Sequence, residues 1–74
     1  MKAFIIKENF EKICIEKNLS AKDAHKMIVD ACKDYSDFIQ IRLGKKPVSP
    51  KIRRKIISEF NIPESDFKKY FEIK

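Results

Sequence analysis

The stretch that decides the fold is Gly44-Lys45-Lys46-Pro47-Val48-Ser49-Pro50-Lys51-Ile52-Arg53-Arg54-Lys55-Ile56. Gly44 is the only glycine of the chain and follows an apolar-periodic segment, so it is predicted to end a helix at positive φ. Ser49 followed by Pro50 predicts an N-cap and the first residue of the next helix. Six of these thirteen residues are Lys or Arg and none is acidic. Such a basic helix start favours a polyanionic partner, because the backbone donors and the macrodipole attract negative charge there.

The length of 74 residues predicts a single domain over residues 1–74, with its core in about 7–71. The net charge of +6 is uneven. Residues 1–44 carry 8 basic and 7 acidic side chains (+1), and residues 45–74 carry 9 basic and 4 acidic ones (+5). This asymmetry favours nucleic acid as a partner over a small neutral ligand. The alternative is a lysine-rich surface that serves solubility.

Several function classes lack their sequence signals. Cys14 and Cys32 fall on apolar helical faces and are expected to be core thiols in a reducing cytosol. The run Phe4-Ile5-Ile6 is too short for secretion or for a membrane span, so we expect a cytoplasmic protein with no membrane partner. His25 is the only histidine, and no metal-ligand spacing, phosphate loop or nucleophile motif is present. We therefore predict no enzyme, no catalytic residue, no metal and no cofactor.

Apolar periodicity predicts the first three helices. The first covers about 7–17. The second follows a capping box that starts at Ser20, and its long apolar stripe extends it to about Cys32. The third is capped by Asp34, turns Phe38 and Ile41 inward, and ends at about Leu43.

The rest of the chain is predicted to add two helices and two short strands. The fourth helix covers about Pro50–Phe60, and a short fifth helix covers about Glu64–Lys69. Met1–Ile6 and Tyr70–Ile73 favour strands, and the tail is predicted to pair with Phe4–Ile6, either within the chain or across a dimer. The predicted fold class is all-α with five helices and this strand pair as an addition.

The order of these elements carries a resemblance. The residues concerned are Leu19-Ser20 before the second helix, Phe38 and Ile41 in the third, Gly44-Lys45-Lys46-Pro47 after it, Ser49-Pro50 at the fourth, and Phe60-Asn61-Ile62-Pro63-Glu64-Ser65-Asp66-Phe67 at the close. In this order they resemble the phage repressor/Cro-type (XRE-like) helix-turn-helix family. The resemblance implies a compact five-helix, lambda-repressor-like DNA-binding domain of phage or mobile-element type.

The chain departs from the family's pattern between the second and third helices. It has about three extra residues near Asp30–Lys33, and it lacks the glycine that members commonly carry in the tight turn. His25 stands where a small residue is usual. We interpret the extra residues as a second helix lengthened by about one turn.

The resemblance implies a sequence-specific transcriptional regulator, a repressor or Cro-like protein, whose third helix enters the major groove of double-stranded DNA. By position, the residues that would contact bases are Tyr35, Ser36, Asp37 and Gln40. Gln40 suits adenine and Asp37 suits cytosine. The alternative is an ordinary solvated helix face. Asp34 and Asp37 also bring negative charge near the phosphates, which argues against base reading, and helix capping is their other role.

Phosphate contacts form a separate class, because they give affinity without sequence information. The candidates are Lys22, Lys26, Lys45, Lys46, Lys51 and Arg54. Arg42 either reaches a phosphate or pairs with a nearby acid. A homodimer on two half-sites is a further expectation, with Tyr70, Phe71 and Ile73 as its surface and core burial as the competing use.

A second function remains open on the sequence. The acidic third helix and the longer connection suit a small protein-interaction module, antitoxin-like or an inhibitor, that keeps the helix-turn-helix scaffold and binds a protein partner.

Overall fold

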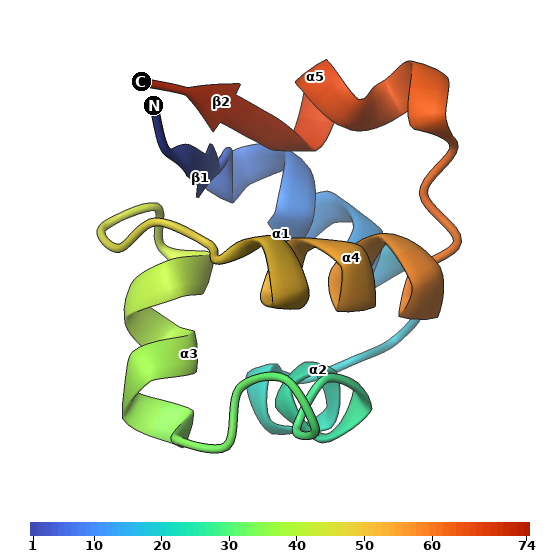
Figure 1. Cartoon of the computed structure of the whole chain (residues 1–74). Helices are drawn as coiled ribbons and strands as arrows, with labels where there is room; N and C mark the ends of the chain where they lie inside the picture. The colour runs from blue at the N-terminus through green and yellow to red at the C-terminus, as the bar shows by residue number, and fades with distance from the viewer.

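The computed structural model covers residues 1–74, and helices make up most of it (Figure 1). In chain order the elements are β1 (Ala3–Ile5), α1 (Lys7–Glu16), α2 (Ala21–Met27), α3 (Tyr35–Arg42), α4 (Pro50–Glu59), a 3₁₀ turn η1 (Glu64–Asp66), α5 (Phe67–Tyr70) and β2 (Phe71–Ile73). The five predicted helices are all present. The fifth is split, since it opens as the 3₁₀ turn before one turn of α-helix.

The two ends of the chain pair with each other. β1 and β2 form a two-stranded antiparallel sheet with Ala3 opposite Ile73 and Ile5 opposite Phe71. This confirms the predicted strand pair and shows that it forms within the chain, so the N- and C-termini lie side by side (Figure 1). On its other edge β1 contacts the segment before α4, because the Val48 N–H donates to the Ala3 carbonyl at 2.8 Å.

Polar caps fix the starts of three helices. The Ser20 hydroxyl accepts from the Asp23 N–H, and the Asp23 carboxylate accepts from the Ser20 N–H, both at 3.2 Å. Asp34 caps α3 by accepting from the Ser36 N–H at 2.8 Å, and Ser49 caps α4 with Pro50 as its first residue. These contacts confirm the predicted starts, because each cap satisfies a backbone donor that the helix leaves free.

The cap of α2 makes a pH prediction. Hydrogen bonds from the Ser20 N–H and then the Ser20 hydroxyl lower the pKa of Asp23 below its ordinary value of 3.8. A carboxyl whose folded pKa is depressed stabilises the fold above its unfolded pKa and loses that contribution as the pH falls through the folded value. We therefore expect Asp23→Ala to be less stable than the parent at neutral pH, with a gap that narrows below about pH 4. Urea unfolding at stepped pH measures this, and a constant gap down to pH 2 contradicts it.

The prediction for the end of α2 is wrong. The helix ends at Met27, and the Ile28 N–H donates to the carbonyl of His25 only three residues back, at 3.1 Å. Beyond the helix the chain packs against the core, where Ile28 and Cys32 are both buried. The extra residues therefore form a connection over 28–34 and do not lengthen the helix. It is longer than the turn of about three to four residues that a helix-turn-helix usually has.

Gly44 ends α3 as predicted. Its φ is +78°. The Lys45 N–H donates to the Gln40 carbonyl at 3.0 Å, which is the bond of a Schellman motif that spans more residues. A Cβ built on Gly44 would lie 2.8 Å from the Ile5 carbonyl oxygen. The position therefore requires glycine for two reasons, the left-handed backbone and the close approach of β1.

One hydrophobic core joins all these elements. Its largest fully buried side chains are Phe10, Phe38, Phe60, Ile28 and Ile56. The rings of Phe10 on α1 and Phe60 after α4 lie 5.2 Å apart, which ties the ends of the helical part together. Cys14 and Cys32 are buried free thiols, as predicted. None of the helices has the length and apolar character that crossing a bilayer requires.

Candidate nucleic-acid interface

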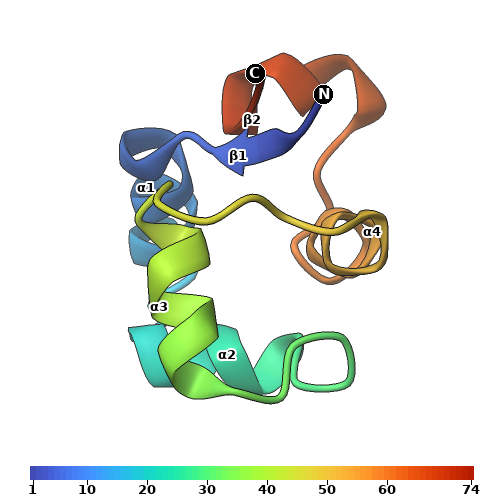
Figure 2. The ribbon, with the colours of Figure 1, turned by 60° about the vertical axis from the view of Figure 1, so that its left-hand side comes forward.

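The outer side of α3 carries the residues predicted to contact bases. Phe38 and Ile41 face the core, as the apolar spacing predicts. Tyr35, Ser36 and Gln40 lie on the same helix and are exposed, as the sequence predicts. Figure 2 shows α3 at one side of the molecule, with the segment that leads to α4 leaving from its upper end. Three of the four side chains are therefore accessible to a partner from solvent.

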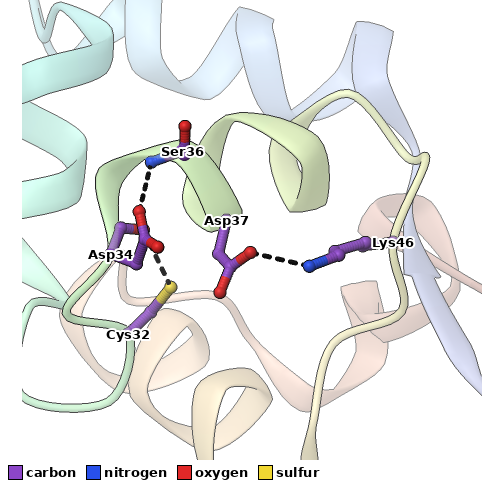
Figure 3. A network of polar contacts seen from close by, with 5 residues as sticks. All are labelled: Cys32, Asp34, Ser36, Asp37 and Lys46. Atoms are coloured by element: carbon purple, nitrogen blue, oxygen red, sulfur yellow. Dashed lines mark hydrogen bonds and ion pairs between the residues drawn. The ribbon is translucent and has the colours of Figure 1, made fainter.

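Asp37 differs from the other three. Its carboxylate forms an ion pair with the Lys46 ammonium, with Nζ and Oδ1 2.6 Å apart (Figure 3). The hydrogen bond to Asp37, together with the charge of that carboxylate, raises the pKa of Lys46. The pair thus joins one candidate base contact on α3 to one candidate phosphate contact in the basic loop. Both side chains are about half exposed, so solvent screens the pair and it contributes little to stability. A phosphate oxygen can therefore replace the carboxylate at Lys46 at small cost.

The connection over 28–34 is held to both of its helices. The His25 side chain on α2 is hydrogen-bonded through Nε2 to the Cys32 carbonyl at 2.8 Å. The same ring packs against Tyr35 and Phe38 of α3, with ring centroids 5.4 and 5.3 Å apart. The sequence analysis missed this role of His25. The signal was available, since a histidine on an inner position of α2 has aromatic residues of α3 within reach.

A second set of contacts orders the start of α3 (Figure 3). The Cys32 thiol donates to the Asp34 carbonyl at 3.7 Å, and the Asp34 carboxylate caps the helix. Burial, followed by the nearby Asp37 and Asp34 carboxylates, raises the pKa of the Cys32 thiol. Burial also raises the pKa of Cys14. Both sulfurs are therefore held as thiols, which makes them poor nucleophiles and metal ligands.

The six predicted phosphate-contact residues are all exposed: Lys22, Lys26, Lys45, Lys46, Lys51 and Arg54. Only Lys46 forms an ion pair with a carboxylate. Lys51 and Arg54 lie on the first turns of α4, whose N-terminus carries the Ser49 cap and no acidic residue in its first turn. Unpaired cations and a helix N-terminus on one short segment make a favourable place for an anion.

The connection after α2 lies beside this basic start of α4. Asp30 and Ala31 line one side of a hollow of about 270 Å³, and Lys51 and Arg54 line the other side with Lys55 and Ser58. The α2–α3 connection and the α4 start are therefore neighbours on the surface. Of the two roles predicted for Arg42, the structure shows the pairing with an acid, because its guanidinium lies 3.9 Å from the Glu11 carboxylate on α1.

The predicted dimer surface needs a correction. Tyr70 and Phe71 are only 9% and 2% exposed, because they close the core beneath the sheet. Ile73 is 46% exposed and is the one residue of the three that remains at the surface. Strand alternation does not explain the difference between Phe71 and Ile73, because their side chains point to the same face of the sheet. Phe71 is covered by the ring of Phe67 at 5.0 Å, whereas Ile73 lies beyond that cover.

A scan against protein-family models finds no match, and searches of curated proteins and of solved structures find no similar one. No group of three or more His, Cys, Asp or Glu side chains is placed to hold a metal ion.

Proposed function

We propose that the protein is a sequence-specific, DNA-binding transcriptional regulator of the repressor/Cro type, acting in the cytoplasm and without catalysis. The observation that carries the proposal is a series of exposed cations without carboxylate partners, which runs along the chain from the loop after α3 to the first turns of α4. Lys45 lies in the loop after α3, and Lys51 and Arg54 lie on α4. These cations supply phosphate contacts, and the exposed side of α3 supplies side chains for the major groove.

The roles divide by chemistry. Gln40 offers an amide that can bond both N6 and N7 of adenine, and Ser36 offers a hydroxyl to either kind of base edge. Tyr35 stands at the start of α3, where its hydroxyl can donate to a phosphate. Asp37 accepts from cytosine N4 only when Lys46 leaves it for a phosphate, so the two contacts are coupled.

Salt dependence of binding to random duplex DNA tests the electrostatic half of the proposal. Because each neutralised phosphate releases counterions, the slope of log K against log salt is about −0.9 per contact, or about −4 to −5 for the five candidate cations other than the paired Lys46. Raising NaCl from 50 to 200 mM should then weaken binding by roughly 500-fold. Lys51→Gln and Arg54→Gln should each flatten the slope by about 1. Lys12→Gln on α1 removes the same charge outside the proposed surface and should leave the slope unchanged.

Selection of binding sites from a random duplex pool tests the proposed base contact of Gln40. Gln40→Ala should keep the affinity for random duplex and change the selected sequences. Identical selected sequences from the parent and the variant would remove Gln40 from the proposal. A parent that fails to bind duplex at low salt overturns the regulator as a whole.

A protein-interaction module is the second candidate, and two observations favour it. The Asp37–Lys46 pair reduces the positive field beside α3, and the connection over 28–34 is longer than the turn of a helix-turn-helix. The same salt experiment separates the two functions, because absence of duplex binding is the result that this second candidate requires.

A further inference from the structure

The connection over 28–34 has few backbone hydrogen bonds of its own. They close one short turn, in which the N–H groups of Ala31 and Cys32 both donate to the Ile28 carbonyl, at 2.9 and 3.0 Å. The two residues that follow, Lys33 and Asp34, donate no backbone hydrogen bond before α3 begins. Backbone contacts alone therefore do not determine the path by which the chain enters α3.

The His25 side chain supplies a contact at this place. Its Nε2 lies 2.8 Å from the Cys32 carbonyl oxygen, and no backbone N–H donates to that oxygen. Because a carbonyl only accepts, Nε2 is the donor and carries the proton. Cys32 is buried, and a buried carbonyl that loses its donor is unfavourable. The hydrogen bond thus ties α2 to the end of the turn that precedes α3.

The same contact extends to the first turn of α3. The Cys32 thiol donates to the Asp34 carbonyl, and the Asp34 carboxylate caps the helix (Figure 3). On the other side, the His25 ring packs against Tyr35 and Phe38 of α3. A displacement of the Cys32 carbonyl would therefore move the cap, and with it the turn of α3 that carries Tyr35.

We propose that His25 is a positioning residue for DNA recognition, because its hydrogen bond to the Cys32 carbonyl sets the direction of α3 relative to α2. This rests on the proposed function and deepens it. A turn of about three to four residues restricts the angle between its two helices by its shortness, and the connection over 28–34 is longer. The hydrogen bond supplies the restriction that the length of the connection does not.

The role of His25 should appear in specificity and not in general affinity. Hydrogen bonds to base edges require a defined direction of α3, since they weaken steeply with angle and distance. The cations Lys45, Lys51 and Arg54 lie outside the connection, and their phosphate contacts carry no sequence information. Loss of the hydrogen bond should therefore weaken binding to a selected site and leave binding to random duplex unchanged. Partial unfolding would instead lower both affinities by the same factor.

Two variants separate the hydrogen bond of His25 from its packing. His25→Phe keeps an aromatic ring and removes the donor. His25→Gln removes the ring and keeps a donor, because its amide nitrogen is as many bonds from Cβ as the imidazole Nε2. Fluorescence anisotropy gives the ratio of the affinities for a selected site and for random duplex. His25→Phe should lower this ratio by about tenfold, the size of one lost base contact, and His25→Gln should stay within about threefold of the parent.

Hydrogen exchange of the free protein tests the same bond without DNA. The amides of Ala31 and Cys32 report on the turn, and the Phe60 amide, which donates to the Ile56 carbonyl, reports on a distant part of the fold. In His25→Phe the first two amides should exchange about tenfold faster or more, relative to Phe60. His25→Gln should keep the rates of the parent within about threefold.

Circular dichroism checks that the variants of His25 are folded. If His25→Phe is unfolded, His25→Met makes the comparison with His25→Gln, because the two side chains have similar length and only the glutamine has a donor. The expected results for His25→Met are those given for His25→Phe.

Three outcomes overturn the proposal. The first is an unchanged affinity ratio in His25→Phe, and the second is a larger fall in His25→Gln than in His25→Phe, since the ring would then be the group that matters. The third is unchanged exchange at Ala31 and Cys32, which needs no DNA. A parent that binds no duplex at low salt overturns the proposed function and the positioning role with it. The exchange rates then decide separately whether the hydrogen bond holds the connection.

Discussion

Gly44→Ala is expected to lower the free energy of unfolding by about 2–4 kcal/mol. A non-glycine residue at φ +78° is strained, and its Cβ would lie 2.8 Å from the backbone oxygen of Ile5. That oxygen belongs to β1, which is fixed by β2, so it has little room to move. The variant must therefore shift either β1 or the loop that carries Lys45 and Lys46.

Urea unfolding at neutral pH measures this loss, and Asn61→Gly is its control. Asn61 also has a positive φ, of 53°, but it carries a side chain already. Replacing it with glycine should leave stability equal to that of the parent or raise it by up to about 1 kcal/mol. A Gly44→Ala variant within about 0.5 kcal/mol of the parent would contradict the close approach seen between Gly44 and Ile5.

Phe38→Ala is expected to cost about 3–5 kcal/mol, the largest loss from a single side chain on α3. Phe38 is fully buried, and its ring also contacts His25, which holds the connection over 28–34. A domain of this size has a total stability of about 4–11 kcal/mol, so the variant should lose a large part of it, and all of it at the lower end of this range.

Gln40→Ala on the same helix is the matched control for this loss. Its side chain is exposed, so its stability should stay within about 0.5 kcal/mol of the parent. Thermal unfolding followed by circular dichroism compares the two variants. Equal loss from both would mean that α3 has no preferred buried side, which contradicts the packing of Phe38 and Ile41.

Local signals explain why much of the fold was predictable. Ser20, Asp34 and Ser49 start helices because their side chains accept from backbone donors, and this chemistry is visible in the sequence. The lone glycine marked the end of α3 for the same reason. The strand pair was predictable from two β-favouring runs, although the sequence left open whether they pair within one chain.

The sequence-based predictions were wrong where contacts between distant parts of the chain determine the structure. The apolar stripe through Ala31 and Cys32 has a helical period, but the helix ends at Met27, and the segment beyond it is held by the hydrogen bond between His25 and the Cys32 carbonyl. The tail Tyr70–Ile73 alternates like a strand at the surface, yet Tyr70 and Phe71 are both buried in the core. The Asp37–Lys46 pair joins residues from α3 and from the loop beyond Gly44, and no sequence pattern indicates their distance. Exposure on α3 was predictable, whereas electrostatic coupling between the two contact classes was not.

The pairing of β1 with β2 has a kinetic consequence. Ala3 and Ile73 are neighbours in space although almost the whole chain separates them. Closing so large a loop costs entropy before its contacts form, so the ends join late, after the helices have assembled. The last step of folding then buries Ala3, Ile5 and Phe71 together. The protein should therefore fold more slowly than a helical bundle of equal length, with its two ends absent from the transition state.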